Sequence, residues 1–366
     1  MKRFERQTIL ADFGATGQEK LTRAKVLVVG AGGLGCPSLL YLAAAGVGTI
    51  GIADGDSISE SNLNRQTLFG QNDIGKPKAE TAATILQEKY PDVSFQVIPE
   101  FLTPQNAPEI IAEYDLILDG SDNFGTRYMI NDLCVLLQKP LIMGAIYQYE
   151  GQLAVFNYGA RPINYRDIYP NPPQSNEIPN CSETGVIGVL PGIIGNLQAA
   201  EAIKLLSGLG EVLVNKLLFY NLKTSGFFEV KVEPNPDSIK SIPRDLESFR
   251  RKNYDITCGM AESIPWEKAF DWSRNLESSL LIDIREAGEM PVFEQSAIEK
   301  IPMSVLLQDQ EPIKAVENVL LFCKSGQRSG NLAARLKELF PEKKIFSIEG
   351  GILDPSSPLN TPTYGT

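Results

Sequence analysis

The chain has 366 residues and a formal net charge of −11 at pH 7. This length predicts one or two domains with a sizeable core, and the acidic balance argues against nucleic acid or an anionic membrane as the main partner. No histidine is present, which excludes histidine metal sites, histidine-based proton transfer, and Ser-His-Asp or Cys-His catalysis.

The cysteines and the N-terminal residues bear on the cellular compartment. The five cysteines are scattered and form no C-x-x-C pair, so we expect a reducing compartment rather than a disulfide framework. The start, MKRFERQTIL, lacks the apolar core of a signal peptide. No apolar run approaches the roughly 20 residues that span a bilayer. We therefore expect a cytoplasmic protein.

The first predicted elements form a βαβ unit. After a predicted helix over Phe4–Leu21, the β-branched run Val26–Val29 is typical of a strand buried on both faces of a parallel sheet. A buried helix over Leu34–Ala45 and a second strand over Thr49–Ala53 follow. We expect this unit to organise the rest of the chain.

A glycine-rich turn joins the first strand to the helix, through Gly30, Gly32, Gly33 and Gly35. Glycines let the backbone approach a phosphate closely, and the helix N-terminus points N–H groups at the anion. Asp54, which lies about 20 residues after the turn, can accept hydrogen bonds from ribose hydroxyls. The pattern predicts a nucleotide site without identifying the nucleotide. The alternative is a glycine turn that binds nothing.

Further α/β elements follow, and they predict two domains, at 1–233 and 266–366, joined by a linker over 234–265. In the first domain we expect helices at Lys78–Tyr90, Thr126–Leu137 and Ile193–Leu206, and strands at Ser94–Phe101, Leu116–Leu118, Leu141–Ala145, Gln152–Asn157, Leu217–Asn221 and Phe227–Val232. In the second we expect strands at Leu280–Ile284, Val319–Phe322 and Lys344–Ile348 and a helix at Gly330–Phe340. The segment Gly159–Gly185, which holds five prolines, is expected to be a long mobile loop. The predicted fold class is α/β, with a Rossmann-like, mainly parallel sheet closed by antiparallel strands and a smaller α/β domain.

Six ordered motifs reveal a family. They are R-Q at 6–7, G-A-G-G-L-G at 30–35, D-x-D at 54–56, S-N-L-N-R-Q at 61–66, G-K-P-K at 75–78 and S-D-N at 121–123. Over about residues 1–232 the chain resembles the MoeB/ThiF adenylyltransferases, relatives of the ubiquitin-activating enzymes. The resemblance implies a homodimer that uses ATP to adenylate the C-terminal Gly-Gly carboxylate of a small ubiquitin-like sulfur-carrier protein.

The residue types in these motifs suit nucleotidyl transfer. A carboxylate that attacks an α-phosphate brings two anions together, so positive charge and a metal ion are needed. Arg65 and Lys78 can clamp phosphates, Asn62 can donate a hydrogen bond to one, and Asp122 can hold Mg²⁺. The resemblance implies that Arg6 reaches the ATP of the other subunit. Each residue also has a structural alternative. Arg6 can form a surface ion pair, and Asp122 can cap a helix. Asn62, Arg65 and Lys78 can be solvated loop side chains.

One cysteine feature distinguishes this chain from the family, and another is shared with it. Many members hold zinc through two C-x-x-C pairs, which would fall at Asn164–Ile168 and near Pro234–Asp237. Neither stretch contains a cysteine, so we expect no zinc. Cys181, in N-C-S-E-T-G-V, matches the family's loop cysteine that can bond covalently to the carrier. The alternative is a free thiol without a role.

The second domain has a cysteine at a strand–helix junction. Cys323 follows a strand and precedes K-S-G-Q-R-S, so helix N–H groups, the helix dipole and Arg328 favour its thiolate. With L-I-D-I-R-E at 281–286 and E-G-G-I at 349–352, the domain resembles a rhodanese, a sulfurtransferase that carries sulfur as a persulfide on this cysteine. A phosphatase loop has five residues between cysteine and arginine, and here there are four. The usual H-I-P-G-A segment is replaced by Ser296–Pro302, so the chain departs from the rhodanese pattern at this point.

We interpret the chain as an ATP-dependent adenylyltransferase that then helps to convert the carrier's C-terminus into a thiocarboxylate. The alternatives are an NAD-dependent Rossmann dehydrogenase and a non-catalytic scaffold for sulfur carriers. The dehydrogenase explains the glycine turn but not the other motifs. The sequence does not distinguish carriers for molybdopterin, thiamine or tRNA thiolation. It also does not distinguish a persulfide donor from thiosulfate.

Overall fold

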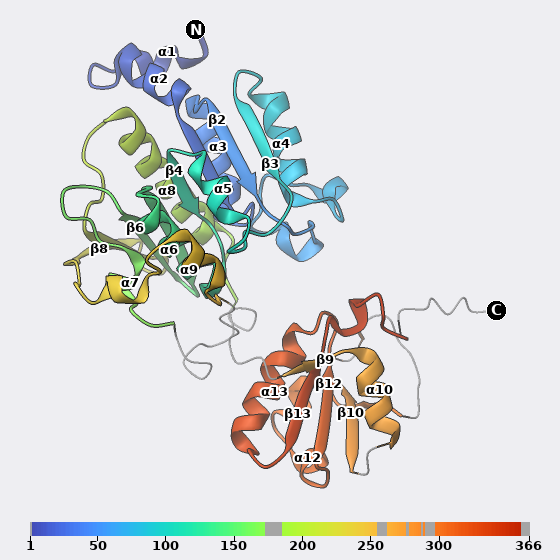
Figure 1. Ribbon diagram of the computed structural model, residues 1–366. Helices are drawn as coiled ribbons and strands as arrows, with labels where there is room; N and C mark the ends of the chain where they lie inside the picture. The colour runs from blue at the N-terminus through green and yellow to red at the C-terminus, as the bar shows by residue number, and fades with distance from the viewer. Residues whose placement is uncertain are drawn as a thin grey trace. The chain divides into compact units, whose positions relative to one another are not determined.

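The chain forms two compact units, and each is described by itself (Figure 1). The computed structural model describes residues 2–172, 185–254, 262–275, 278–286, 288–289 and 297–359. Of these, the residues up to 254 belong to the first unit and those from 262 onward to the second. No described helix is long and apolar enough to cross a membrane.

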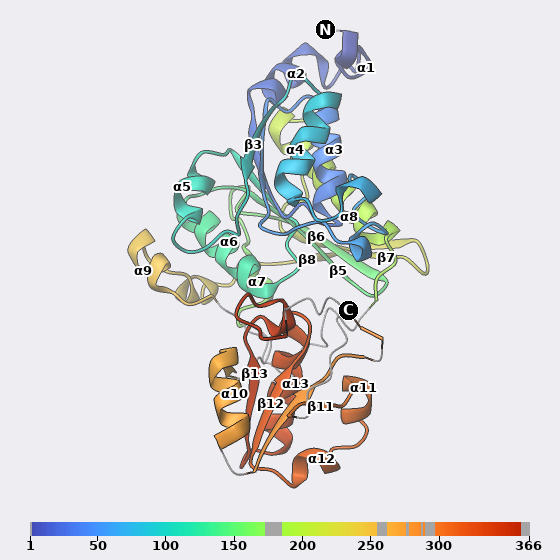
Figure 2. The ribbon, with the colours of Figure 1, turned by 90° about the vertical axis from the view of Figure 1, so that its right-hand side faces the viewer.

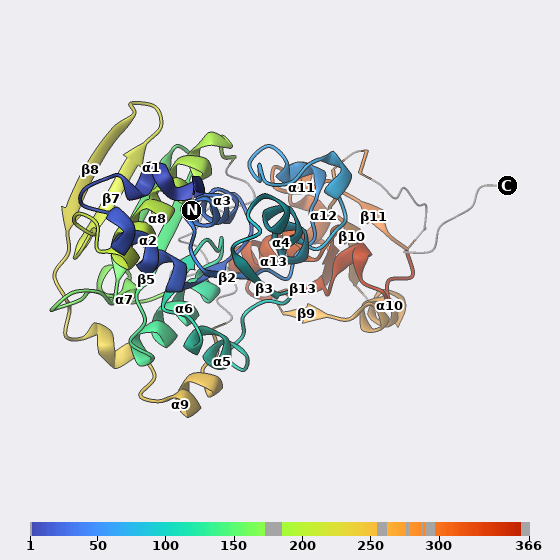
Figure 3. The same cartoon turned by 90° about the horizontal axis from the view of Figure 1, so that it is seen from above.

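An eight-stranded sheet forms the centre of the first unit. Its order is β3-β2-β1-β4-β5-β6-β7-β8, parallel from β3 to β5 and antiparallel from β5 to β8, which is an outer edge strand (Figure 3). The strands are β1 (Lys25–Val29), β2 (Thr49–Ala53), β3 (Ser94–Ile98), β4 (Leu116–Asp119), β5 (Leu141–Tyr147), β6 (Glu150–Phe156), β7 (Lys216–Asn221) and β8 (Gly226–Lys231). The expected Rossmann-like sheet with antiparallel closing strands is confirmed.

Helices cover both faces of this sheet (Figure 2). They are η1 (Lys2–Phe4), α1 (Glu5–Thr8), α2 (Gly14–Arg23), α3 (Gly35–Ala45), η2 (Glu60–Asn62), η3 (Gln71–Asp73), α4 (Lys78–Lys89), α5 (Ala107–Ala112), α6 (Phe124–Leu136), α7 (Tyr165–Ile168), α8 (Val189–Ser207), η4 (Ser238–Ser241) and α9 (Leu246–Arg251). α3, α4 and α8 share one core, whereas α5, α6, α7 and α9 share the other. Val26 and Val28 enter the first core and Leu27 and Val29 the second. β1 is therefore apolar at four successive positions, because its side chains alternate between two buried faces.

In the first unit, two predicted helices differ most from the structure in where they begin or end. The helix expected over Phe4–Leu21 is divided into α1 and α2, and Gly14, with φ of +58°, lies at the start of α2. α8 begins at Val189, before the expected Ile193, although Pro191 lies in its first turn. Proline is tolerated there because the first-turn N–H groups have no intrahelical acceptor.

Part of the segment expected to be a linker is folded onto the first unit. η4 and α9 both lie in this segment, and Phe249 of α9 is fully buried in the core beside α6. Asp245 caps α9 by accepting a hydrogen bond from the Ser248 backbone N–H at 2.7 Å. The described residues of this segment up to Tyr254 are thus a structural part of the first unit.

A five-stranded parallel sheet forms the second unit, with the order β11-β10-β12-β13-β9. Its strands are β9 (Ser263–Ile264), β10 (Ser279–Asp283), β11 (Glu299–Lys300), β12 (Asn318–Phe322) and β13 (Lys344–Ile348). Its helices are α10 (Trp266–Asn275), α11 (Met303–Leu306), α12 (Glu311–Lys314), α13 (Gln327–Leu339) and η5 (Gly351–Leu353). α10 and α13 pack on opposite faces of the sheet (Figure 1). The expected smaller α/β sheet is confirmed.

Candidate active site

The glycine turn lies where β1 and β4 meet. Gly30 has φ of +92°, and a Cβ there would lie 2.9 Å from the carbonyl oxygen of Gly120. A Cβ on Gly35 would lie 1.8 Å from the carbonyl oxygen of Gly30, so both positions require glycine. β1 and β4 are neighbours although β2 and β3 come between them in the chain. The turn therefore lies where the strand order reverses, which is the usual ligand crevice of such sheets.

The N-terminus of α3 lies at the end of this turn. Its N-cap residue, Leu34, supplies no side-chain hydrogen bond, so the first N–H groups of the helix have no side-chain acceptor. A Cβ on Gly33 would lie 3.5 Å from Cγ of Arg65. The structure thus brings Arg65 beside the turn, next to a helix end that favours anions.

Asp54 is tied to the same turn. Its carboxylate accepts hydrogen bonds from the backbone N–H of Ala31 at 2.7 Å and of Asp56 at 2.8 Å. Burial raises the pKa of Asp54 above its usual range, while these two bonds and the charge of Lys78 oppose the rise. Each carboxylate oxygen keeps a lone pair after one bond, so the predicted contact with ribose hydroxyls is compatible with this geometry.

Lys78 is held at the edge of the site by an ion pair. Its side chain is 8% exposed, and Nζ lies 2.9 Å from Oδ2 of Asp56. Its backbone N–H also donates to the Asp56 carbonyl oxygen at 2.9 Å. The ammonium group is therefore positioned by the D-x-D motif, with two further N–H donors available to a phosphate.

The polar loop between β2 and α4 orders its own side chains. Arg65 donates from Nη1 to the Ser61 carbonyl oxygen at 2.9 Å and to Oδ1 of Asn64 at 3.0 Å. Oδ1 of Asn62 accepts from the Ser59 backbone N–H at 3.2 Å. These bonds leave the remaining guanidinium N–H groups and the Asn62 amide donors for a ligand.

The loop after β4 contains two carboxylates in opposite environments. Asp122 is exposed and has no hydrogen bond or ion pair with the described residues, whereas Asp119 is fully buried. Oδ1 of Asp119 accepts from the N–H and the hydroxyl of Ser121, at 2.9 and 2.6 Å. Asn123 caps α6 by accepting from Thr126, so the helix-cap alternative for Asp122 is wrong. A free carboxylate is the kind of oxygen ligand that Mg²⁺ takes from protein, with phosphates and water supplying the rest.

The sequence analysis missed the buried groups that support this loop. Nε of Arg127 lies 3.4 Å from Oδ2 of Asp119, and its Nη2 donates to the Ser121 carbonyl oxygen at 3.0 Å. Gln198 of α8 donates to the Asp119 carbonyl oxygen at 2.8 Å. Asp119 raises the pKa of Arg127 against the opposing effect of burial. A charged residue inside an apolar strand–helix pattern, such as Asp119 after Leu116–Leu118, is the sequence signal that could have found them.

Arg6 lies far from the glycine turn of its own chain. The next residue, Gln7, donates to the Ala45 carbonyl oxygen at 3.2 Å, which places α1 beside the C-terminal end of α3. The glycine turn is at the other end of this helix, roughly 15 Å away along its axis. Arg6 is exposed, and the structure does not bring it together with Arg65 and Lys78 within one chain.

Of the two candidate sulfur-handling cysteines, Cys323 lies among the described residues. Cys181 lies outside the described residues. Cys323 is fully buried directly after β12, and the Ser329 hydroxyl lies 3.6 Å from its Sγ. Gly326, with φ of +81°, makes the turn into α13. The predicted junction of strand, cysteine loop and helix is therefore present in the second unit.

Arg328 makes its closest contact with a carboxylate. Its Nη1 and Nη2 donate to the two carboxylate oxygens of Glu289, at 2.5 and 2.6 Å. These bonds lower the pKa of Glu289 to about 2, and they raise the pKa of Arg328, to which Cys323 also contributes. The Arg328 guanidinium therefore interacts with both the Glu289 carboxylate and Cys323.

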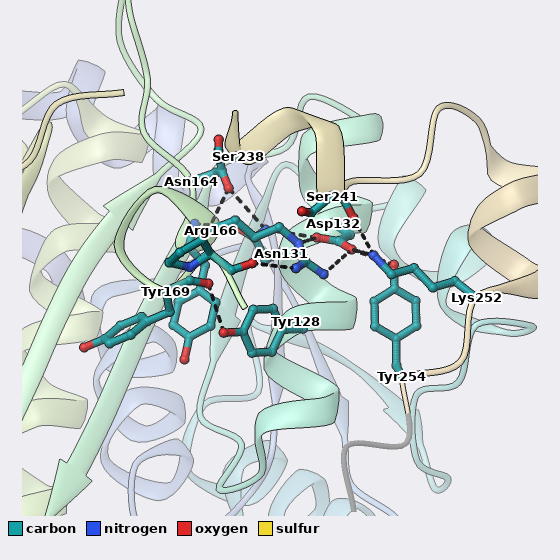
Figure 4. Close-up of polar contacts among 12 residues, drawn as sticks. Tyr128, Asn131, Asp132, Asn164, Arg166, Tyr169, Ser238, Ser241, Lys252 and Tyr254 are labelled. Atoms are coloured by element: carbon teal, nitrogen blue, oxygen red, sulfur yellow. Dashed lines mark hydrogen bonds and ion pairs between the residues drawn. The ribbon is translucent and has the colours of Figure 1, made fainter. Parts of the chain in front are cut away.

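The two stretches at which the family resemblance would place zinc ligands bond to each other directly. Oδ1 of Asp167 accepts from the Asn235 backbone N–H at 2.7 Å, and Oδ2 accepts from Nδ2 of Asn164 at 2.8 Å. Nδ2 of Asn164 also donates to Ser238 at 3.2 Å (Figure 4). In the described ranges no group of three or more His, Cys, Asp or Glu could hold a metal ion. Hydrogen-bonded amide, hydroxyl and single carboxylate groups do not fit a zinc site, whose ligands are thiolates and imidazoles. The zinc-free state stays a prediction.

Asp132 forms the centre of the adjoining buried network (Figure 4). Its carboxylate accepts from Nε and Nη2 of Arg166 at 2.6 and 2.9 Å, from Nζ of Lys252 at 2.9 Å and from the Tyr254 hydroxyl at 2.8 Å. Burial, and then the Asp132 charge, raise the pKa of Tyr254 well above its usual range. One carboxylate on α6 thus holds the α7 segment and the residues after α9 together.

Comparison with known proteins matches both units of the chain. The ThiF family model matches residues 4–240. The probable adenylyltransferase/sulfurtransferase MoeZ of Mycobacterium tuberculosis is 38% identical over 359 residues, which is 96% of this chain and 91% of that protein. The adenylyltransferase and sulfurtransferase MOCS3 of Drosophila virilis is 36% identical over 96% of this chain and 82% of its own length. The sulfur carrier protein adenylyltransferase of Thermus thermophilus is 49% identical over 64% of this chain and 89% of its own length.

A solved structure has a similar fold over about two thirds of the chain. E. coli MccB crystallised with ATP has a TM-score of 0.57 and 24% identity, and the match covers 64% of this chain and 72% of that one. At this identity the likeness concerns the fold alone.

Proposed function

Because the chain belongs to the ThiF family, we propose that it activates a small sulfur-carrier protein with ATP and then transfers sulfur to it. The observation that carries this proposal is the match to adenylyltransferase/sulfurtransferases over 96% of the chain, which includes both units. Relatives with these names favour an adenylyltransferase over an NAD-dependent dehydrogenase. The carrier that we propose is ubiquitin-like and ends in Gly-Gly.

In the first half-reaction, a carboxylate oxygen of the carrier attacks the α-phosphorus of ATP. The bond from this phosphorus to pyrophosphate breaks, and an acyl-adenylate forms. Lys78 and Arg65 orient the phosphates and offset their charge, while the glycine turn and the start of α3 supply backbone N–H donors. Asp54 receives the ribose hydroxyls, and Asn62 donates to a phosphate.

Asp122 would hold Mg²⁺, since its exposed carboxylate is free of other partners in the described part of the chain. The ion would neutralise phosphate charge. Arg6 acts on the ATP of a partner subunit in a homodimer. This role is supported by its place at the far end of α3 from the glycine turn of its own chain.

In the second half-reaction, Cys323 carries the sulfur. Its thiolate attacks the outer sulfur of a persulfide donor, the donor thiolate leaves, and Cys323 holds a persulfide. The terminal sulfur then attacks the acyl-adenylate carbonyl carbon and AMP leaves. Attack by Cys181 on the Cys323 sulfur releases the carrier thiocarboxylate and leaves a disulfide, which a cellular thiol reduces. We also propose a reducing, cytoplasmic setting, since the five cysteines of the chain are scattered and contain no C-x-x-C pair.

Mass spectrometry of the carrier tests the proposal. The full-length protein, supplied with Mg²⁺-ATP, a persulfide donor and a Gly-Gly carrier, should replace one carboxylate oxygen by sulfur. Cys323→Ala should retain ATP–pyrophosphate exchange and lose the thiocarboxylate. Cys181→Ala should retain exchange and sulfur transfer to a small thiol, and lose turnover of the carrier. A thiocarboxylate formed by Cys323→Ala without added sulfide would exclude the relay. A wild-type protein without exchange activity would favour the scaffold alternative.

A further inference from the structure

Gln66 is a buried polar residue beside the glycine turn to which the proposed site assigns no role. Its side chain is 4% exposed. Its backbone N–H donates to the Asn62 carbonyl oxygen at 2.9 Å, and its own carbonyl oxygen accepts from Phe69 at 3.1 Å. These bonds fix the residue in a turn directly after Arg65.

The side-chain amide of Gln66 lies against the turn. A Cβ added to Gly32 would lie 3.8 Å from Nε2 of Gln66, so the amide nitrogen is in van der Waals reach of the second glycine. Oε1 is fully buried and has no hydrogen-bond partner among the described residues. Nε2 likewise has no described acceptor, yet it is not among the fully buried unpaired atoms. The donor end of the amide therefore faces the accessible side of Gly32.

This arrangement is unfavourable for folding by itself. A buried amide without hydrogen bonds destabilises a protein, and a methionine of similar length would fill the same space without this penalty. The amide nitrogen lies beside Gly32, where the lack of a side chain permits a phosphate to approach, and Arg65 lies beside the next glycine, Gly33. A neutral donor at this point adds a hydrogen bond to an anion without adding charge.

We propose that Gln66 is a further nucleotide-binding residue, and that its Nε2–H group donates a hydrogen bond to a phosphate oxygen of ATP held over Gly32. The inference rests on the adenylation function proposed above and assigns one more contact to its ATP site. It concerns the phosphates rather than the adenosine, because Nε2 lies beside Gly32 of the glycine turn.

Gln66→Met separates this role from a structural one. It removes the donor and the unpaired oxygen while retaining the length of the side chain. We expect the Kd of the full-length protein for Mg²⁺-ATP, measured by calorimetry, to rise about ten- to a hundredfold, as for a lost hydrogen bond to a charged group. Adenosine binding should not change, and the melting temperature without ligand should stay the same or rise. The control, Gln71→Met, changes an exposed glutamine of η3 in the same polar segment and should leave all three values unchanged.

Several results would overturn the inference. Unchanged ATP affinity in Gln66→Met would show that the amide makes no contact. An equal loss for ATP and adenosine, or a lower melting temperature, would indicate a general structural role. Gln66→Glu is the second variant, for use if the methionine variant does not fold, and its carboxylate should repel the phosphates and weaken ATP binding further. A wild-type protein that binds no Mg²⁺-ATP would instead overturn the proposed site itself.

Discussion

Asp122 and Asp119 lie three residues apart and have opposite surroundings. Asp119 is fully buried and hydrogen-bonded to Ser121, whereas Asp122 is exposed and without a described partner. Asp119 therefore stabilises the loop, whereas the Asp122 carboxylate is available to a metal ion. The sequence D-G-S-D does not indicate this difference, because the burial of each aspartate is set by the packing of α6 and α8 around the loop.

Asp122→Ala should lower kcat for ATP–pyrophosphate exchange by about a hundredfold or more, because the lost metal contact removes charge stabilisation in the transition state. The fold should be unaffected, since the side chain is exposed. Asp92→Ala, which removes an exposed carboxylate near Arg3, is the matched control and should retain full exchange. Exchange that persists in Asp122→Ala would mean that another group binds the ion.

Glu289 predicts a pH dependence of the second unit. The Arg328 hydrogen bonds lower its pKa from 4.5 to about 2, so the ionised pair stabilises the fold above about pH 4.5 and this contribution is lost as the pH falls toward 2. Both tryptophans of the chain, Trp266 and Trp272, lie in this unit, so their fluorescence reports its unfolding alone. The stability difference between wild type and Glu289→Gln should be largest near neutral pH and shrink in acid. A difference that does not vary with pH would contradict this assignment.

The segment after β8 shows how an element can be misjudged from composition. Its prolines and polar residues favoured a linker, but Asp245 and Ser248 cap a short helix whose Phe249 is fully buried. The capping pair Asp245 and Ser248 was a local signal for this helix. The burial of Phe249, however, depends on contact with α6, more than 100 residues earlier in the chain, and no local pattern predicts that contact.

Asp132→Asn should destabilise the first unit by about 3–5 kcal/mol, because it leaves the buried charge of Arg166 without its full partner. Calorimetry of the full chain should show a lower melting temperature for the first unit, while the tryptophan-reported transition of the second stays in place. Glu247→Gln breaks an exposed pair with Arg251 on α9 and should change the stability by less than about 0.5 kcal/mol. Equal stability of wild type and Asp132→Asn would contradict this prediction. It would mean that the interactions of the network only offset the free energy lost when its charges are desolvated.

The proposed role of Arg6 leads to a prediction about the homodimer. If each active site combines Asp122 of one subunit with Arg6 of the other, Arg6→Ala and Asp122→Ala are each inactive alone. Equal mixing with subunit exchange should then restore roughly a quarter of wild-type exchange activity, because half of the dimers are mixed and each of these has one intact site. Light scattering should show a dimer at micromolar concentration. Failure to recover activity in a mixture proven to exchange subunits would place Arg6 outside the site.

The sequence alone determined the βαβ unit, the order of the motifs and the cysteine at a strand–helix junction. Each of these is encoded locally, by glycines that a tight turn requires and by apolar runs whose period matches one element. Only the tertiary structure decided which carboxylate of the 119–123 loop is free, that Arg328 is shared with Glu289, and that the amide of Gln66 faces Gly32. It also showed that residues up to Tyr254 belong to the first unit. These features depend on side chains that meet across long sequence separations, where burial and pairing are set by packing rather than by neighbours in the chain.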